Sequence, residues 1–156
     1  MEILGTGLSG TLGRKMASFV KPAQITLGKD RLHNYFRRNE SSFTLIHLAG
    51  VVGEKQVSQN LDYSELINVR ETLNLAKEVI EDFGGRFIHI SSSHVYGPSI
   101  DDISEEFPLN PQSRYADQKA RAEQALMEYF GQNHQQLVVL RVFSVLGWDV
   151  ADFTLG

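Results

Sequence analysis

A tyrosine and a lysine stand four residues apart in the segment Tyr115-Ala-Asp-Gln-Lys119, a spacing that brings both side chains to one face of a helix. A free phenol has a pKa of about 10 and is a poor base near neutral pH. A lysine ammonium beside it stabilises the phenolate and lowers that pKa, so the pair could move a proton to or from a substrate oxygen. Ordinary amphipathic helices carry the same spacing. Here Lys119 shares its face with Ala122 and Leu126, which predicts a partly buried lysine stem.

Three serines, Ser91, Ser92 and Ser93, lie where the apolar run RFIHIS ends. Ligands of open α/β sheets bind outside the carboxyl ends of the strands, so a hydroxyl there could bond a substrate oxygen and hold it against Tyr115. A serine-rich turn without function is the alternative. The order of glycine loop, strand-end serine and Tyr-x-x-x-Lys favours a site.

Two glycine fingerprints overlap in the stretch GTGLSGTLG near the N-terminus. One is Gly5-x-Gly7-x-x-Gly10 and the other is Gly7-x-x-Gly10-x-x-Gly13. The second frame leaves a first strand of six residues, Met1 to Thr6, which is close to the usual strand length of about 5–6 residues. It also places a glycine one helical turn into the helix, where the missing side chain allows close packing. We therefore favour the second frame.

Backbone N–H groups from Leu8 to Thr11 would face a pyrophosphate at the positive end of the following helix. The glycines could also serve only to make a turn, because a glycine fingerprint alone is a weak signal. Its position after a strand and before a helix favours a dinucleotide site.

The elements that must position these groups follow from alternating apolar runs and amphipathic stretches. Strands separated by helices indicate parallel pairing through right-handed crossovers, so we predict a doubly wound parallel α/β sheet. The run FTLIHL is nearly all apolar, as expected of a strand covered on both faces. The predicted strands are 1–6, 23–27, 43–48, 86–91 and 137–143, and the predicted helices are 10–20, 32–38, 62–83 and 113–130.

Local signals set the expected ends of these elements. Asp62 and Glu65 have the spacing of a capping box, and Ser113 is a plausible N-cap. Residues 50–61 and 97–112 are predicted to be loops, and the strand 137–143 is predicted to be buried. In the first helix we expect Leu12, Met16 and Phe19 on one side. Only one strand and one short helix fit between the glycine loop and Phe43, so the adenosine side of a cofactor pocket would be thin.

Composition limits the partners. The 156 residues fit one domain, and a net charge of −4 without a basic run argues against nucleic acid and anionic membranes. Cysteine is absent, and the five histidines show no ligand spacing, so we predict no disulfide and no metal. We expect no signal peptide and no membrane span, and therefore a cytoplasmic protein.

In their order along the chain, the motifs resemble the extended short-chain dehydrogenase/reductases, the NAD-dependent epimerase/dehydratase family that acts on nucleotide sugars. The resemblance runs through essentially the whole chain and implies a Rossmann-like fold. The matching motifs are TGLSGTLG (6–13), HLAG (47–50), Asn68 with Thr72, SSSHVYG (91–97), PLNP (108–111), Tyr115 with Lys119, and LRVFSVLG (140–147).

The resemblance implies a role for each matching residue. Ser92 stands at the position of the catalytic Ser/Thr, Tyr115 transfers the proton, and Lys119 binds the nicotinamide ribose and lowers the tyrosine pKa. Hydride then moves between a sugar carbon and the nicotinamide ring. The implied cofactor-binding residues are Gly7, Leu8, Ser9, Gly10, Thr11, Gly13, Asp30, Leu48, Ala49, Gly50, Tyr115 and Lys119.

The cofactor could be NAD or NADP. Asp30 lies where an acidic residue would hold the adenosine ribose 2′-hydroxyl, which favours NAD. The neighbouring Lys29 and Arg31 could instead bind a 2′-phosphate.

Departures from the family pattern reduce the number of reactions that we expect of this chain. Dehydratases of the family carry Asp-Glu after the catalytic threonine, where this chain has Ser93 and His94. An epimerase or a ketosugar reductase is therefore favoured over a 4,6-dehydratase. His94 could act as an acid or base, or could only cap a loop. Ser144 replaces a frequent asparagine that contacts the substrate.

Family members also carry a C-terminal substrate lobe of comparable size. We expect residues 1–156 to be an NAD(P)-binding domain truncated before that lobe, with weak or no cofactor binding and poor sugar turnover on its own. A catalytically silent dinucleotide-binding or scaffold protein of the same fold is the alternative. Helices 62–83 and 113–130 correspond to those that pair family dimers, which implies a homodimer.

Overall fold

The computed structural model describes residues 1–20, 23–24, 42–131 and 134–143. Several predictions from the sequence lie outside these ranges: the end of the second strand, the helix 32–38, Asp30 with its neighbours, and Ser144.

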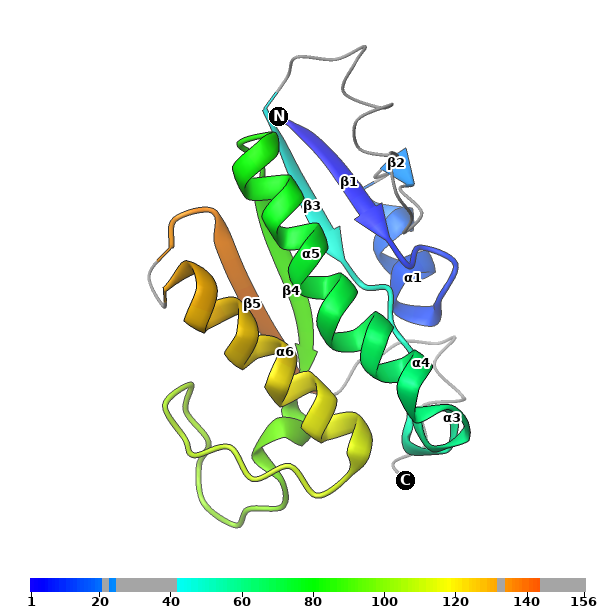
Figure 1. Cartoon of the computed structure of the whole chain (residues 1–156), viewed down its shortest axis with the longest axis vertical. Helices are drawn as coiled ribbons and strands as arrows, with labels where there is room; N and C mark the ends of the chain where they lie inside the picture. Colours follow the sequence, from blue (N-terminus) through cyan, green and yellow to red (C-terminus); the bar gives the residue numbers. More distant parts are fainter. Residues whose placement is uncertain (21–22, 25–41, 132–133, 144–156) are drawn as a thin grey trace.

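Five strands of the described residues form one parallel sheet in the order β2-β1-β3-β4-β5 (Figure 1). The predicted doubly wound α/β sheet is confirmed. After β1 the chain forms β2 on one side of β1 and then β3 on the other side. The direction of strand succession thus reverses between β1 and β3, and α/β sheets bind their ligands at such a point. The strands are β1 (Glu2–Thr6), β2 (Ala23–Gln24), β3 (Phe43–His47), β4 (Arg86–Ser92) and β5 (Leu137–Val142).

Helices α5 and α6 lie side by side in front of the sheet in Figure 1. The connection from β1 to β2 crosses the sheet in the direction opposite to the connections β3 to β4 and β4 to β5. A right-handed crossover therefore puts α1 on the other face of the sheet. The helical elements are α1 (Thr11–Val20), α3 (Glu54–Gln59), α4 (Leu61–Glu65), η1 (Leu66–Glu71), α5 (Thr72–Lys77), η2 (Glu78–Asp82), η3 (Ser93–Tyr96) and α6 (Arg114–Phe130).

Elements α4 to η2 form one continuous helix over residues 61–82, within one residue of the prediction. Two of its segments, η1 and η2, are π-helical, which the sequence did not predict. The predicted capping box is wrong: the N-cap is Asn60, whose side chain accepts a hydrogen bond from the Tyr63 N–H at 3.0 Å. The predicted loop 50–61 is also wrong in part, because it contains the short helix α3.

The N-cap of α6 is Ser113, as predicted, and its Oγ accepts the Ala116 N–H at 3.1 Å. Gly131 ends the helix with a φ of +83°, a conformation that favours glycine. The loop expected from 97 to 112 has no helix or strand. Before it, residues 93–96 form the short 3-10 helix η3.

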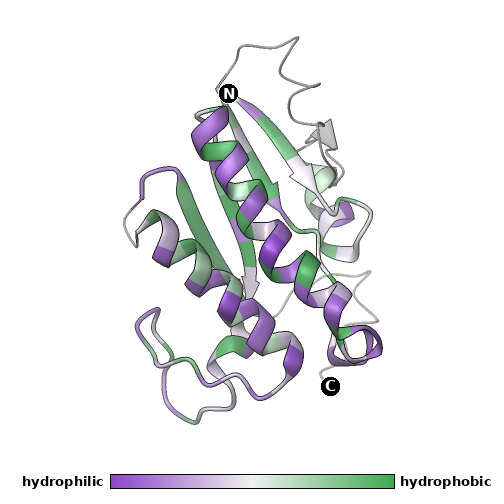
Figure 2. Ribbon diagram, viewed as in Figure 1, coloured by the Kyte–Doolittle hydropathy of each residue, from purple (hydrophilic) through white to green (hydrophobic). Residues whose placement is uncertain are grey.

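The hydrophobic core lies between the sheet and the α5–α6 layer. Figure 2 shows apolar residues concentrated on the strands and polar residues along the outer sides of α5 and α6. β3 is buried along nearly its whole length, as predicted. The main cluster of buried residues contains Leu4, Phe43, Leu45, Leu75, Ala76, Val79, Ile80, Phe87 and Leu126.

The predicted burial of the strand 137–143 is wrong. β5 is half-buried with Leu140 46% exposed, because it forms an edge of the described sheet. Phe19 is 77% exposed at the end of α1, and Leu66 is 42% exposed on the outer side of the long helix. Within the described residues, no helix combines the length and the apolar character needed to cross a bilayer.

Candidate active site at the carboxyl ends of the strands

The turn between β1 and α1 is built around Gly7 and Gly13. Gly7 has a φ of +70°, and a Cβ on it would lie 2.5 Å from the Ala49 nitrogen. A Cβ on Gly13 would lie 2.3 Å from the Gly7 carbonyl oxygen. The three atoms nearest to a Cβ on Gly5 would all belong to the Leu8 side chain. The steric demands therefore fall on the second glycine frame, and the turn rests directly on the backbone that follows β3.

A chain of hydrogen bonds fixes the backbone after β3. The Ala49 N–H donates to Thr6 Oγ1 at 3.3 Å, and Thr6 Oγ1 lies 2.7 Å from His47 Nδ1. On the other side of the ring, His47 Nε2 lies 3.1 Å from Thr72 Oγ1, and the Thr72 hydroxyl donates to the Ile67 carbonyl at 3.3 Å. Since the Thr72 proton is used on Ile67, the imidazole must donate from Nε2 and accept at Nδ1.

His47 is thus a neutral histidine inside the sheet. Burial, and then the charge of Lys119, lower its pKa from 6.5 to about 3. His89 faces it from β4 with ring centroids 5.8 Å apart, and burial lowers the pKa of His89 well below its usual value. Neither ring nitrogen of His89 has a hydrogen-bond partner among the described residues.

The buried histidines predict that acid destabilises the protein. The folded state holds His47 neutral down to a pKa of about 3, whereas the unfolded chain takes up a proton near 6.5. Stability is therefore complete above about pH 6.5 and is lost as the pH falls toward 3. Between pH 7.5 and pH 5, His47 alone lowers the free energy of unfolding by about 2 kcal/mol.

Urea unfolding followed by circular dichroism at both pH values measures this change. His47→Gln should weaken the dependence on pH, because the variant lacks the imidazole that only the unfolded chain protonates above about pH 3. An equal dependence in His47→Gln would contradict the assignment.

Ser92 is the last residue of β4 and the N-cap of η3. Its Oγ accepts the His94 N–H at 3.3 Å, and the side chain is partly exposed. Ser91 is buried and donates to the carboxylate of Glu123 in α6. Of the two serines, the Ser91 hydroxyl is thus taken up by Glu123, whereas Ser92 remains partly exposed.

Lys119 reaches the same strand end from α6. Its Nζ donates to the Ile90 carbonyl at 2.7 Å, and only 7% of the residue is exposed. Burial lowers the Lys119 pKa to about 8, against a smaller opposite effect of Glu123. An ammonium has three N–H groups, and within the described part of the chain only the Ile90 carbonyl accepts one of them.

The expected lowering of the Tyr115 pKa is not found. Burial raises the pKa of its phenol above the usual value of 10. The lysine ammonium is directed to the Ile90 carbonyl, and desolvation of the phenolate dominates at Tyr115.

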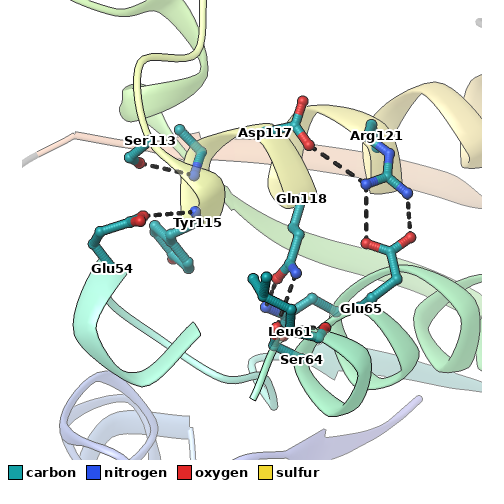
Figure 3. Close-up of polar contacts among 11 residues, drawn as sticks. Glu54, Leu61, Ser64, Glu65, Ser113, Tyr115, Asp117, Gln118 and Arg121 are labelled. Atoms are coloured by element: carbon teal, nitrogen blue, oxygen red, sulfur yellow. Dashed lines mark hydrogen bonds and ion pairs between the residues drawn. The ribbon is translucent and has the colours of Figure 1, made fainter. Parts of the chain in front are cut away.

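The helix that carries Tyr115 and Lys119 is tied to the α3–η1 segment by side-chain contacts (Figure 3). Glu54 Oε2 accepts the Tyr115 N–H at 3.2 Å, and this bond is the main cause that lowers the pKa of Glu54. Arg121 pairs with Glu65 one to two turns further along α6. The Glu54 contact could not be predicted from the sequence, because residues 50–61 carry no helical pattern.

Gln118 forms the buried part of this contact. Asn68 Nδ2 donates to Gln118 Oε1 at 2.8 Å, and Gln118 Nε2 donates to Ser64 Oγ at 2.9 Å. Asn68 also accepts the Val51 N–H at 2.8 Å and donates to the Val51 carbonyl at 2.9 Å. All three polar side chains are at least 96% buried. The backbone after β3 is thereby connected to the residue that precedes Lys119.

The structure brings together most of the residues predicted from the sequence. The turn of residues 7–13 lies on Leu48 and Ala49, and Gly50 packs on Asn68. Ser92 and Lys119 meet the end of β4, and Tyr115 lies one turn before Lys119 on α6. Among the described residues, no three His, Asp or Glu side chains gather as a metal site.

A parallel sheet, a glycine turn where the strand order reverses, and serine, tyrosine and lysine near the strand ends define a Rossmann-like α/β domain of the short-chain dehydrogenase type. The model of the NAD dependent epimerase/dehydratase family matches residues 22–153, and the chain belongs to this family.

Known relatives are nucleotide-sugar enzymes by name. The GDP-6-deoxy-D-mannose reductase of Pseudomonas aeruginosa is 28% identical, with 91% of this chain and 51% of the reductase aligned. The human dTDP-D-glucose 4,6-dehydratase is 34% identical over 82 residues, which are 52% of this chain and 23% of the dehydratase. The chain spans about half the length of the reductase and a smaller part of the dehydratase.

Solved structures agree on the fold. RMD from Pseudomonas aeruginosa in complex with NADPH is 26% identical with a TM-score of 0.72, covering 92% of this chain and 54% of that one. A UDP-glucuronic acid 4-epimerase from Bacillus cereus in complex with NAD is 24% identical with a TM-score of 0.73, covering 94% and 57%.

Proposed function

We propose that this chain is the cofactor-binding part of an NAD(P)-dependent nucleotide-sugar epimerase or ketosugar reductase. The observation that carries the proposal is the glycine turn seated on Leu48 and Ala49, with Tyr115 and Lys119 on the helix across the same sheet edge. Family membership and the names of the relatives support it. The chain spans about half the length of the Pseudomonas aeruginosa relatives, and we take residues 1–156 to correspond to their dinucleotide-binding domain.

The turn suits a dinucleotide, because the missing side chains at Gly7 and Gly13 let it pack directly on the backbone after β3 and on the start of α1. We assign the pyrophosphate to the amides of residues 7–11 at the start of α1, where the helix dipole favours an anion. Leu48, Ala49 and Gly50 would lie beneath the cofactor. Two N–H groups of Lys119 would bind the ribose hydroxyls of the nicotinamide nucleoside.

The choice between NAD and NADP rests on Asp30. Its carboxylate would bond a ribose 2′-hydroxyl and repel a 2′-phosphate, so we assign NAD. Lys29 and Arg31 beside it, and the NADPH bound to RMD, support NADP instead.

In the proposed reaction, the cofactor would supply or accept the hydride, and residues of the chain would transfer the proton. Ser92 and Tyr115 would bond the sugar oxygen whose carbon reacts. Because burial raises the Tyr115 pKa, the phenol is protonated near neutral pH, the form that gives a proton to a carbonyl oxygen during reduction. Lys119, with a pKa of about 8, is mainly cationic at pH 7 and stabilises the phenolate that results.

The residues that follow Ser92 favour a reductase or an epimerase over a dehydratase. Elimination of water from the sugar needs an additional acid and base, and Ser93 and His94 stand where family dehydratases carry Asp-Glu.

We assign the protein to the cytoplasm, which suits a chain without cysteine, and propose a homodimer through helices 61–82 and 114–130. The two helices lie side by side on the outer side of the sheet (Figure 1). Leu61, Tyr63 and Leu66 expose 42, 55 and 42% of their surface on the first of them, which supports an apolar partner face.

Two assays on the natural protein test the function. Nicotinamide fluorescence during titration with NADH and NADPH measures cofactor binding, and addition of a nucleotide-linked 4-ketosugar then measures turnover. We expect dinucleotide binding, tighter for NADH, and loss of reduced nicotinamide when the ketosugar is added. The isolated 156 residues should bind weakly and turn over poorly. Tighter NADPH binding would overturn the cofactor assignment, and binding without turnover would support the silent scaffold.

A further inference from the structure

A buried ion pair lies behind the proposed site. Arg141 of β5 donates from Nε and Nη2 to Glu123 Oε2 of α6 at 2.9 and 2.8 Å. The side chains are 1% exposed for Glu123 and 15% for Arg141. Burying two charges costs several kcal/mol per ion, which their attraction only partly returns, so such a pair is weak evidence of a purely stabilising role.

The pair holds both ends of the segment that contains Ser92. On the Glu123 side, the Ser91 hydroxyl donates to Oε1 of the carboxylate. On the Arg141 side, Nη1 donates to the Tyr96 hydroxyl at 2.6 Å and to the Glu105 carbonyl at 2.9 Å. Ser92 therefore lies between two residues anchored to one ion pair.

Glu123 also continues the helix face that carries the proton-transfer residues. Tyr115, Lys119 and Glu123 are spaced four residues apart along α6, so they project from neighbouring turns of one face. Lys119 bonds the Ile90 carbonyl, and Glu123 bonds the side chain of the next residue, Ser91. These two contacts set the register of α6 against the last residues of β4.

The charge of Glu123 acts on Lys119 as well. The titratable groups around Lys119 are His47 of β3, His89 of β4, and Tyr115 and Glu123 of its own helix, with Arg141 of β5 beyond the carboxylate. Burial lowers the pKa of both histidines and raises that of the phenol, so all three are uncharged near pH 7. Among the described residues, Glu123 is the group that raises the Lys119 pKa against the effect of burial.

We propose that Glu123 is a positioning residue of the proton-transfer group: it fixes Ser92 through Ser91 and supplies the negative charge that keeps Lys119 cationic. The inference rests on the proposed function for its chemical meaning, but its effect on Lys119 can be measured without any turnover.

The test uses lysine labelled with ¹³C at Cε and follows its NMR shift with pH. Lys119 is assigned as the signal missing in Lys119→Met. Glu123→Gln removes the charge but leaves Arg141 buried and unpaired, so the main variant is the double replacement Glu123→Gln with Arg141→Met, which removes both charges and keeps the volume. Glu128→Gln, at an exposed position of the same helix, is the control.

We expect the Lys119 titration to move down by roughly one pH unit in the double variant and to stay unchanged in Glu128→Gln. In the natural protein, kcat should fall about tenfold at pH 8 with little change in KM, and its alkaline limb should shift to lower pH. Glu123→Asp should restore part of both effects, whereas a merely structural role would not move the Lys119 titration.

An unchanged Lys119 titration in a folded double variant would overturn the proposal. If the titration moves but Tyr115→Phe leaves turnover intact, then the proposed function fails while the effect of Glu123 on Lys119 stands. The two failures can thus be told apart.

Discussion

Replacing Tyr115 by phenylalanine is expected to lower turnover roughly 100- to 10,000-fold, the range that a positioned acid or base contributes. We assign the phenol hydroxyl to the hydrogen bond with the sugar oxygen, and phenylalanine lacks this hydroxyl and its acidic proton. At pH 7 the raised pKa of the phenol keeps that proton in place until the reaction needs it. Single-turnover rates with reduced nicotinamide and a ketosugar measure the loss.

The fold should not change in this variant. The Tyr115 backbone N–H still donates to Glu54, Ser113 still caps α6, and the Lys119 contact with Ile90 does not involve the phenol. Dinucleotide affinity is therefore expected to stay within a few-fold of the wild type. Tyr129→Phe, 49% exposed near the end of the same helix, serves as the control and should be fully active. Undiminished turnover in Tyr115→Phe would rule out the proposed mechanism.

The sheet could be predicted well from the sequence, because the apolar patterns of buried strands and amphipathic helices are visible within short stretches of the chain. The β3 run is nearly all apolar and lies in the middle of the sheet, as such a run must. Ser113 and Gly131 mark the ends of α6 with ordinary capping chemistry. β5 has the same apolar character but forms an edge, and no local pattern distinguishes an edge strand from a central one.

Short helices and long-range polar contacts escaped the sequence reasoning. Helix α3 buries a single residue, Val57, so it has no apolar period to detect. The Glu54 contact with Tyr115 and the Gln118 contact with Asn68 join residues 50 or more positions apart. The rise in the Tyr115 pKa escaped for the same reason, because desolvation depends on which side chains cover the phenol.

The two glycine frames were distinguished in the sequence by strand length and by the glycine one turn into the helix, and they predict opposite mutational results. Gly13→Ala is expected to weaken dinucleotide binding roughly tenfold to hundredfold and to destabilise the fold by about 1–3 kcal/mol. Its Cβ would lie 2.3 Å from the Gly7 oxygen and 2.5 Å from Leu8 Cα, both backbone atoms that side-chain rotation cannot move. The start of α1 must shift, and with it the amides assigned to the pyrophosphate.

Gly5→Ala is the matched control, because its Cβ would come within 2.7 Å of Leu8 Cδ2 only, the end of a side chain that can rotate. We expect it to cost less than about 1.5 kcal/mol of stability and to leave binding nearly unchanged. Thermal unfolding and NADH titration of both variants measure the two effects separately. If Gly5→Ala abolishes binding while Gly13→Ala binds normally, then Gly5-x-Gly7-x-x-Gly10 is the functional frame.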